Sequence, residues 1–300
     1  MKKQKSNLFL IHNEGTFAKL TKQRLEVFFC IHPFTIRKNY YIKLLENQIY
    51  NIIIRNKFNL IVYISGETKD DSFMKKLNFD LPYFIADICD KKNIPLVYLS
   101  SLSVYGIPRK NTVDVLTEKF PFNNYGKTKY AFDEVLKNKL NDLRFCSIAP
   151  GTIINPYSQK DNLIKNSIKK LSSKPLIWLL KILSPSGNFA CVHIDDLTSA
   201  LAKECINITS KNNIKVYKLF KNCSNKISIY NLVTYISGKK PLFKINSIPI
   251  QIINITSFFL PRKYIMTLIV YFADIDYKSE YGFLKERDIS EYLTFQKKVD

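Results

Sequence analysis

The sequence has little arginine: only 7 of its 46 basic residues are Arg, and the other 39 are Lys. Arginine is the side chain that proteins favour for bidentate recognition of phosphates and bases. The lysines are scattered, with no run of five basic residues. We therefore interpret the formal net charge of +21 as background composition and expect no specific nucleic-acid partner. Electrostatic binding to a nucleic acid or an anionic membrane is the alternative, and it predicts an affinity that collapses as salt rises.

Metal-binding cysteine patterns are also missing. The six cysteines form no Cys-x-x-Cys motif and have no paired histidine spacing, so we predict no metal site. Most of them lie in apolar runs such as FFCI and ADIC, which is typical of reduced, buried thiols. A cytoplasmic location is the expectation that follows.

No stretch of 18 uninterrupted apolar residues is present, which predicts that no helix spans a membrane. The basic start MKKQK is followed by only about five apolar residues, too few for a signal peptide. The longest apolar segments, Leu176–Ile182 and Ile248–Leu260, are interrupted by polar residues and are interpreted as core or interfacial helices.

Short apolar runs alternate with helix-length segments through the first half of the chain. This rhythm is typical of an α/β fold, a Rossmann-like doubly wound parallel sheet, and the near-continuous apolar strands fit a sheet covered on both faces. We expect residues 1–150 to form an NAD(P)-binding domain to which 189–236 partly return, and 151–188 with 237–300 to form a smaller, mixed substrate lobe. The expected strands are Leu8–Ile11, Glu26–Ile31, Leu60–Ile64, Leu96–Leu99 and Arg144–Ile148, and the expected helices are Thr16–Arg24, Tyr40–Arg55, Phe79–Lys91 and Tyr125–Lys139.

The first strand leads into a glycine-poor version of the dinucleotide-binding turn. Gly15 takes the middle glycine position and Ala18 the third, but His12 stands at the first, where a Cβ crowds a tight turn. Asn13 tolerates a left-handed conformation nearby. We expect Asn13 and Gly15 to contact a cofactor, and an ordinary strand-to-helix turn is the alternative.

The most informative segment combines two hydroxyls with a Tyr–Lys pair. Ser100 and Ser101 end a strand, and Tyr125 and Lys129 follow at i and i+4, on one face of a helix. Three other Tyr-xxx-Lys matches begin at Tyr217, Tyr235 and Tyr281, so the pair alone is not specific. The full combination is specific: a strand, the double serine, Val-Tyr-Gly, a loop and then Tyr-Gly-Lys-Thr-Lys.

This combination resembles the extended short-chain dehydrogenases/reductases of the NAD-dependent epimerase/dehydratase family, which modify nucleotide sugars. The resemblance covers nearly the whole chain. Its other elements are Tyr63-Ile-Ser65-Gly66 at the third strand, Asn78 in the next helix, Ala149-Pro150-Gly151 beside the nicotinamide, Val192-His-Ile-Asp-Asp196, and Tyr281-Gly-Phe283.

The resemblance implies roles for the hydroxyls and for the lysine. Tyr125 is the expected acid/base, Ser101 the hydroxyl that orients the reacting oxygen, and Lys129 both the group that lowers the pKa of Tyr125 and a ligand of the nicotinamide ribose. Free Tyr has a pKa near 10, so base catalysis near neutral pH needs about 4 kcal/mol of differential stabilisation from nearby positive charge. The expected cofactor contacts also include Ser65, Gly66, Ser100 and Pro150.

The details favour a particular reaction and leave the cofactor open. Leu102 and Ser103 stand where sugar 4,6-dehydratases carry an Asp-Glu pair, which disfavours dehydration and favours 4-epimerisation or 4-ketoreduction. NAD users carry an acid after the second strand; here Arg37 follows instead, which favours NADP over NAD. His193 is expected to be structural or to line the substrate.

We therefore predict an NAD(P)-dependent enzyme with a nucleotide-sugar substrate, active in polysaccharide or glycolipid precursor synthesis. Family resemblance implies a homodimer formed through packed helices. The alternative is a family member that binds nucleotide without catalysis, as a regulator or scaffold; it is motivated by His12, by the missing acid after the second strand, and by Ala149 where many relatives carry Arg.

Overall fold

The structure is a computed structural model that describes residues 5–37, 42–138, 140, 142–157, 182–185, 187–210, 218–256, 272–282, 284 and 290–291. The chain divides into two compact units, and each is described by itself. Unit 1 comprises Met1–Gly106, Pro121–Ala149 and Asp195–Lys221, and unit 2 comprises Ile107–Phe120, Pro150–Ile194 and Asn222–Asp300. The assignment of one region to cofactor and the other to substrate stays a prediction.

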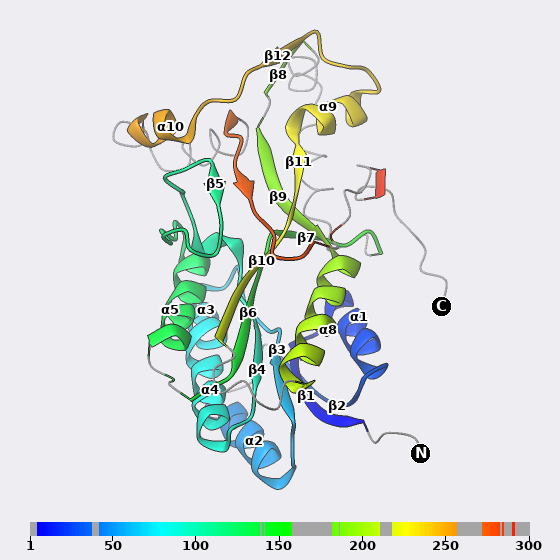
Figure 1. Cartoon of the computed structure of the whole chain (residues 1–300), viewed down its shortest axis with the longest axis vertical. Helices are drawn as coiled ribbons and strands as arrows, with labels where there is room; N and C mark the ends of the chain where they lie inside the picture. The colour runs from blue at the N-terminus through cyan, green and yellow to red at the C-terminus, as the bar shows by residue number, and fades with distance from the viewer. Residues whose placement is uncertain are drawn as a thin grey trace. The chain divides into compact units, whose positions relative to one another are not determined.

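A six-stranded sheet forms the centre of unit 1 (Figure 1). Its strand order is β10-β6-β4-β3-β1-β2, and the pairs from β2 through β6 are parallel. Strand β2 lies on one side of β1, whereas β3 and the later strands lie on the other, so the order of the strands reverses between β1 and β3. Open α/β sheets bind ligands at this reversal point, at the carboxyl ends of the strands. The strands are β1 (Ser6–Asn13), β2 (Phe29–Ile36), β3 (Leu60–Tyr63), β4 (Leu96–Leu99), β6 (Phe145–Pro150) and β10 (Lys218–Cys223).

The central strands are buried on both faces. Every residue of β3, β4 and β6 is buried, which explains their unbroken apolar sequences. The expected second strand was placed wrongly: Glu26 closes helix α1, and β2 runs from Phe29 through Pro33 to Ile36. Pro33 does not end the strand because β2 lies at the sheet edge, where a missing N–H is tolerated.

Helices cover both faces of this sheet. Figure 1 shows α1 and α8 on one face and α2, α4 and α5 on the other. A single π-turn, Lys76–Asp80, joins α3 to α4 and carries Asn78. The helix that was expected to start at Phe79 is therefore a continuation of helical turns that begin at Asp71. The helices are α1 (Thr16–Glu26), α2 (Ile42–Arg55), α3 (Asp71–Lys75), α4 (Leu81–Lys92), α5 (Asn124–Asn138) and α8 (Ile194–Ser210).

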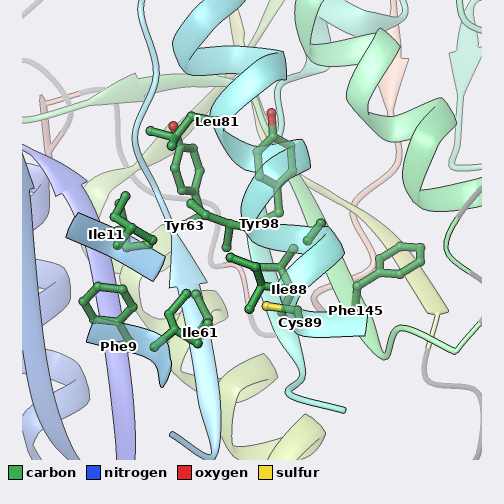
Figure 2. Packing of buried hydrophobic residues seen from close by; sticks show 14 of the residues in the cluster. Phe9, Ile11, Ile61, Tyr63, Leu81, Ile88, Cys89, Tyr98 and Phe145 are labelled. Atoms are coloured by element: carbon green, nitrogen blue, oxygen red, sulfur yellow. The ribbon is translucent and has the colours of Figure 1, made fainter. Parts of the chain in front are cut away.

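The core of unit 1 lies between the sheet and the helices α2, α4 and α5. Aromatic rings fill much of it: Tyr98 meets Phe132 edge-on at 4.6 Å between centroids, and Phe9 stacks on Phe58 at 5.0 Å. Figure 2 shows Tyr63, Tyr98 and Cys89 packed with aliphatic side chains from the strands and from α4. This packing fixes the strand ends that carry the candidate site.

The described residues of unit 2 form three small sheets, as expected for a mixed lobe. They are ordered β11-β9-β7, β12-β8 and β13-β5. Within the described residues, no helix is long and apolar enough to cross a membrane. The elements are β5 (Thr112–Val113), β7 (Thr152–Ile154), β8 (Leu183–Pro185), β9 (Asn188–His193), β11 (Asn225–Ser228), α9 (Ile229–Ser237), β12 (Phe243–Ile245), α10 (Ile250–Thr256) and β13 (Asp276–Tyr277).

Candidate active site

The double serine lies immediately after β4. Ser101 caps the short 3-10 helix η2 (Leu102–Val104), because its Oγ accepts a 3.2 Å hydrogen bond from the N–H of Ser103. The same Oγ donates to Ser103 Oγ at 3.1 Å. The cap holds a nearly buried hydroxyl at the carboxyl edge of the parallel sheet.

Helix α5 brings Tyr125 to this hydroxyl. Asn123 caps the helix by accepting a 2.7 Å hydrogen bond from the N–H of Gly126. Gly126 packs so closely on η2 that a Cβ there would overlap the carbonyl oxygen of Ser103. This approach places Tyr125 beside Ser101. Burial has the larger effect on the pKa of Tyr125 and raises it, and the Ser101 hydroxyl opposes that shift.

Lys129 lies one turn further along α5, with its side chain buried. Its Nζ donates to the carbonyl oxygen of Leu99 at 2.9 Å and to that of Ser65 at 3.4 Å, and it lies 4.6 Å from the centroid of the Tyr98 ring. Burial lowers the pKa of Lys129 to about 7, and the charge of Asp133 opposes that shift.

Asp133 is a buried carboxylate that the sequence analysis missed. One oxygen accepts from Ser100 Oγ at 3.1 Å and the other from Ser147 Oγ at 2.9 Å. Its only sequence signal is its position four residues after Lys129, on the same helix face. Ser100, expected among the cofactor contacts, is thus bonded to the helix that carries the lysine.

The turn after β1 differs from the expectation for two residues. His12 does not crowd the turn, because it lies within β1 opposite Thr35, and its Nε2 is 3.5 Å from Thr35 Oγ1. Asn13 is not left-handed: it ends β1, and among the described non-glycine residues only Asn93 has a positive φ. Its side chain instead donates to the carbonyl oxygen of Gly66 at 2.6 Å and accepts from Ser65 Oγ.

Gly15 supplies the tight turn. Its φ of +145° is a conformation that side-chain-bearing residues rarely adopt, and no atom lies within 4 Å of where its Cβ would be. It precedes α1, which has no acidic residue in its first turn and no side-chain cap. An open, uncapped helix N-terminus suits a phosphate group.

Gly66 follows β3 and lies against the lysine. A Cβ at Gly66 would be 3.3 Å from Lys129 Nζ and 3.1 Å from Asn78 Oδ1. Asn78, buried in the π-turn, accepts from the N–H of Glu67 and donates to Thr128 Oγ1 at 3.1 Å. Ser65, Gly66, Asn78 and Lys129 are therefore brought together.

Arg37 follows the end of β2 directly. Its guanidinium is exposed and lies 3.3 Å from the carboxylate of Glu14, in the turn before α1. Sheet register places the ends of β1 and β2 side by side, since Asn13 pairs with Ile36. The basic group and the Gly15 turn thus share one edge of the sheet.

Three further residues singled out in the sequence are described by the structure. Pro150 is the buried last residue of β6, and His193 is buried with its ring 6.1 Å from that of Tyr157. Tyr235, which begins another Tyr-xxx-Lys match, is exposed. Tyr217 and Phe283 lie outside the described residues, and within the described ones no group of three His, Cys, Asp or Glu could hold a metal.

Comparison with known proteins identifies relatives of two kinds. The chain is 29% identical over 137 residues to an ADP-L-glycero-D-manno-heptose-6-epimerase of Brachyspira hyodysenteriae, a match that covers 43% of each chain. It is 28% identical over 123 residues to the N-acetyl-alpha-D-glucosaminyl-diphospho-ditrans,octacis-undecaprenol 4-epimerase of Escherichia coli O157:H7, which covers 38% of this chain and 37% of that one. The chain thus matches less than half the length of these curated relatives.

Solved structures share the fold at low identity. A dTDP-4-dehydrorhamnose reductase from Yersinia enterocolitica superposes with a TM-score of 0.62 and 18% identity, covering 93% of this chain and 92% of that one. UDP-glucose 4-epimerase from Brucella ovis, in complex with NAD, gives a TM-score of 0.60 and 13% identity over 80% and 85% of the two chains.

A family model described as "NAD dependent epimerase/dehydratase family" matches residues 35–217. That match covers more than half of the chain, from the end of β2 to beyond α8. It includes Ser101, Tyr125 and Lys129 in the arrangement described above. The predicted resemblance and the predicted Rossmann-like fold are both confirmed. This chain belongs to the NAD-dependent epimerase/dehydratase family.

Proposed function

We propose that the protein is an NAD(P)-dependent oxidoreductase that acts on a nucleotide-activated sugar, as a 4-epimerase or a 4-ketoreductase. The observation that carries the proposal is the close packing of α5 on the Ser101 cap, which brings the helical turn of Tyr125 and Lys129 to that hydroxyl. The Lys129 ammonium is buried there and donates to the carbonyl oxygen of Leu99. The names of the relatives support the substrate class, since they include epimerases of diphosphate-activated sugars and a reductase of a dTDP sugar.

Oxidation at a sugar carbon removes a hydride from the carbon and a proton from its oxygen. A bound nicotinamide would supply the acceptor or donor of that hydride. Tyr125 takes or returns the proton, and Ser101 holds the same oxygen in place by a hydrogen bond. Because burial raises the pKa of Tyr125, this role needs positive charge close to the phenol in the working enzyme.

The residues present suit a dinucleotide. The open space at Gly15 and the uncapped start of α1 accommodate a pyrophosphate. Gly66 leaves room beside the Lys129 ammonium, which would bond ribose hydroxyls from its buried position. Asn13 keeps the ends of β1 and β3 together at the reversal point of the sheet.

Water elimination lacks its acid here. Leu102 is buried and apolar, and Ser103 is engaged by Ser101. Neither side chain has a carboxyl group that could protonate a leaving hydroxyl. Redox chemistry at one carbon is the reaction that these residues support.

The cofactor is proposed to be NADP rather than NAD. The support is Arg37, a permanent cation at the end of β2, where its guanidinium is accessible to a ribose 2′-phosphate. The end of β2 itself carries no acid for the two free ribose hydroxyls of NAD, and the carboxylate near this position is that of Glu14, paired with Arg37.

Tyr125→Phe tests the proposal. Turnover of dTDP-, UDP- and ADP-linked sugars should fall by about 10²–10⁴-fold, the usual contribution of a positioned acid/base. Affinity for NADPH, measured by calorimetry, should change little because the ring remains. Tyr83→Phe, at an exposed tyrosine of α4, is the matched control and should be fully active. Unchanged turnover in Tyr125→Phe would refute the acid/base role, and absence of binding by NAD, NADH, NADP and NADPH would favour a non-catalytic family member.

A further inference from the structure

The charge of the chain is distributed unevenly along its length. Residues 205–273 contain ten Lys or Arg and no Asp or Glu, so all 25 acidic residues lie outside this segment. The described part of this segment provides β10, β11, α9, β12 and α10, mostly in unit 2. If the acidic residues were spread evenly along the chain, a segment of this length would contain several of them.

Within this segment, one loop exposes apolar and basic side chains together. Helix α9 ends at Gly238, whose φ of +68° turns the chain sharply. The sequence that follows, Lys239-Lys240-Pro241-Leu242-Phe243-Lys244, is here named the KKPLFK loop. Leu242 is 74% exposed and Phe243 is 63% exposed, so two large apolar side chains that are adjacent in sequence are uncovered.

The loop's backbone is anchored while its side chains face outward. Phe243 begins β12, which pairs with β8 (Figure 1). Pro241 is buried, which fixes the loop to the unit beneath it. Lys239, Lys240 and Lys244 of the same loop are exposed, and Lys244 Nζ lies 5.6 Å from the centroid of the Tyr230 ring.

We propose that the KKPLFK loop docks on the surface of an anionic lipid membrane. Leu242 and Phe243 would enter the boundary between headgroups and acyl chains, and the three lysines would contact lipid phosphates. Exposed apolar and basic side chains in one loop can combine hydrophobic and electrostatic attraction to such a surface.

The composition of the loop favours a membrane over a nucleic acid. All three of its cations are Lys, whereas base and phosphate recognition in nucleic acids favours the bidentate guanidinium of Arg. Leu242, the more exposed of the two apolar side chains, offers no ring for a base to stack on, but it suits acyl chains. The inference does not depend on the enzymatic activity proposed above.

Vesicle co-sedimentation of the full chain tests the proposal. We expect binding to phosphatidylcholine vesicles that contain about a third phosphatidylserine, and much weaker binding to pure phosphatidylcholine or at about 0.5 M salt. The triple variant K239Q/K240Q/K244Q should bind about 100-fold more weakly, given the usual contribution of each lysine near an anionic surface. The double variant Leu242→Ser/Phe243→Ser should weaken binding both at low salt and at about 0.5 M salt, because hydrophobic contact is not screened by salt.

A matched variant separates a docking site from diffuse charge. K57Q/K92Q/K137Q removes three exposed lysines of unit 1 with the same change in net charge. It should bind vesicles like the unmodified protein. Equal losses in the two triple variants, or tighter binding to RNA or DNA than to vesicles at physiological salt, would overturn the proposal.

Insertion of the two apolar side chains has its own signal. The chain has one tryptophan, so Trp178→Phe with Phe243→Trp places a single fluorophore in the loop. Its emission should shift to the blue when anionic vesicles are added. An unshifted emission from protein that co-sediments with vesicles would overturn the placement of this loop in the membrane.

Discussion

Lys129 Nζ donates a 2.9 Å hydrogen bond to the carbonyl oxygen of Leu99, the last residue of β4. The bond ties helix α5 to the strand that precedes Ser101. It also holds an ammonium group where burial disfavours its charge, and Asp133 is the group whose charge opposes that effect. The charge state of the lysine therefore depends on a carboxylate that does not itself face the proposed substrate oxygen.

Asp133→Asn should change the pH dependence of turnover. Removing the carboxylate charge moves the pKa of Lys129 below its present value of about 7. If turnover requires the charged lysine, the alkaline limb of the pH–rate profile moves to lower pH. Turnover on that limb then falls about tenfold for each pH unit by which the limb moves. The measurement is kcat/KM against pH.

Glu134→Gln is the matched control for this change. Glu134 is the next residue on α5, is half-buried, and accepts a 3.2 Å hydrogen bond from Asn138 rather than contacting the site. Its profile should match that of the unmodified protein. A profile of Asp133→Asn that keeps its alkaline limb would show that Asp133 has only a structural role.

Lys129→Met should alter how stability depends on pH. The folded pKa of about 7 lies below the ordinary value of 10.5, so between these pH values the unfolded chain binds a proton that the folded chain lacks. Stability of the unmodified protein therefore rises with pH across this window. The variant loses this dependence, so its gain in melting temperature should be largest below about pH 7 and should shrink towards pH 10.5.

Thermal unfolding of both proteins at several pH values measures this difference. Lys127→Met, at an exposed lysine of the same helix, should show a difference that does not change with pH. The same result for Lys129→Met would mean that the buried amine does not titrate near neutral pH in the folded protein.

The sequence was sufficient where local pattern and tertiary environment agree. The four-residue apolar run of β4 is buried on both faces, and its observed bounds are those expected, Leu96–Leu99. Strand β2 was misplaced because Pro33 is a strand breaker everywhere except at an edge, and edge position is a property of the whole sheet.

Asp133 shows what the sequence could not indicate. An Asp in a helix is usually solvated, and this one is buried where two hydroxyls meet it, that of Ser100 directly after β4 and that of Ser147 within β6. The depressed pKa of Lys129 has the same origin, since burial depends on the packing of α5 against the sheet. The Tyr125 and Lys129 spacing, by contrast, could be read directly from helical periodicity.

Gly126→Ala should separate α5 from η2. The new methyl group would overlap the carbonyl oxygen of Ser103, which is backbone and cannot rotate away. We expect a loss of about 1–3 kcal/mol in the free energy of unfolding, as for other overpacked contacts, with a drop in turnover as Tyr125 moves from Ser101. Gly282→Ala is the control, because open space surrounds that position. Equal stability of the two variants in urea unfolding would contradict the close packing.

Arg37→Ala should shift the cofactor preference towards NAD. A charge-assisted hydrogen bond contributes about 1.5–3 kcal/mol, so loss of the guanidinium should weaken NADPH binding by about 10–100-fold and leave NADH binding nearly unchanged. Glu14→Gln removes the carboxylate that lies 3.3 Å from this guanidinium and would repel a 2′-phosphate, so it should strengthen NADPH binding. The effect should be slight because the pair is exposed. Arg55→Ala, at an exposed arginine that ends α2, controls for net charge. Calorimetric titration of each variant with both cofactors decides the matter: an unchanged ratio of the two affinities in Arg37→Ala would remove Arg37 from the cofactor site.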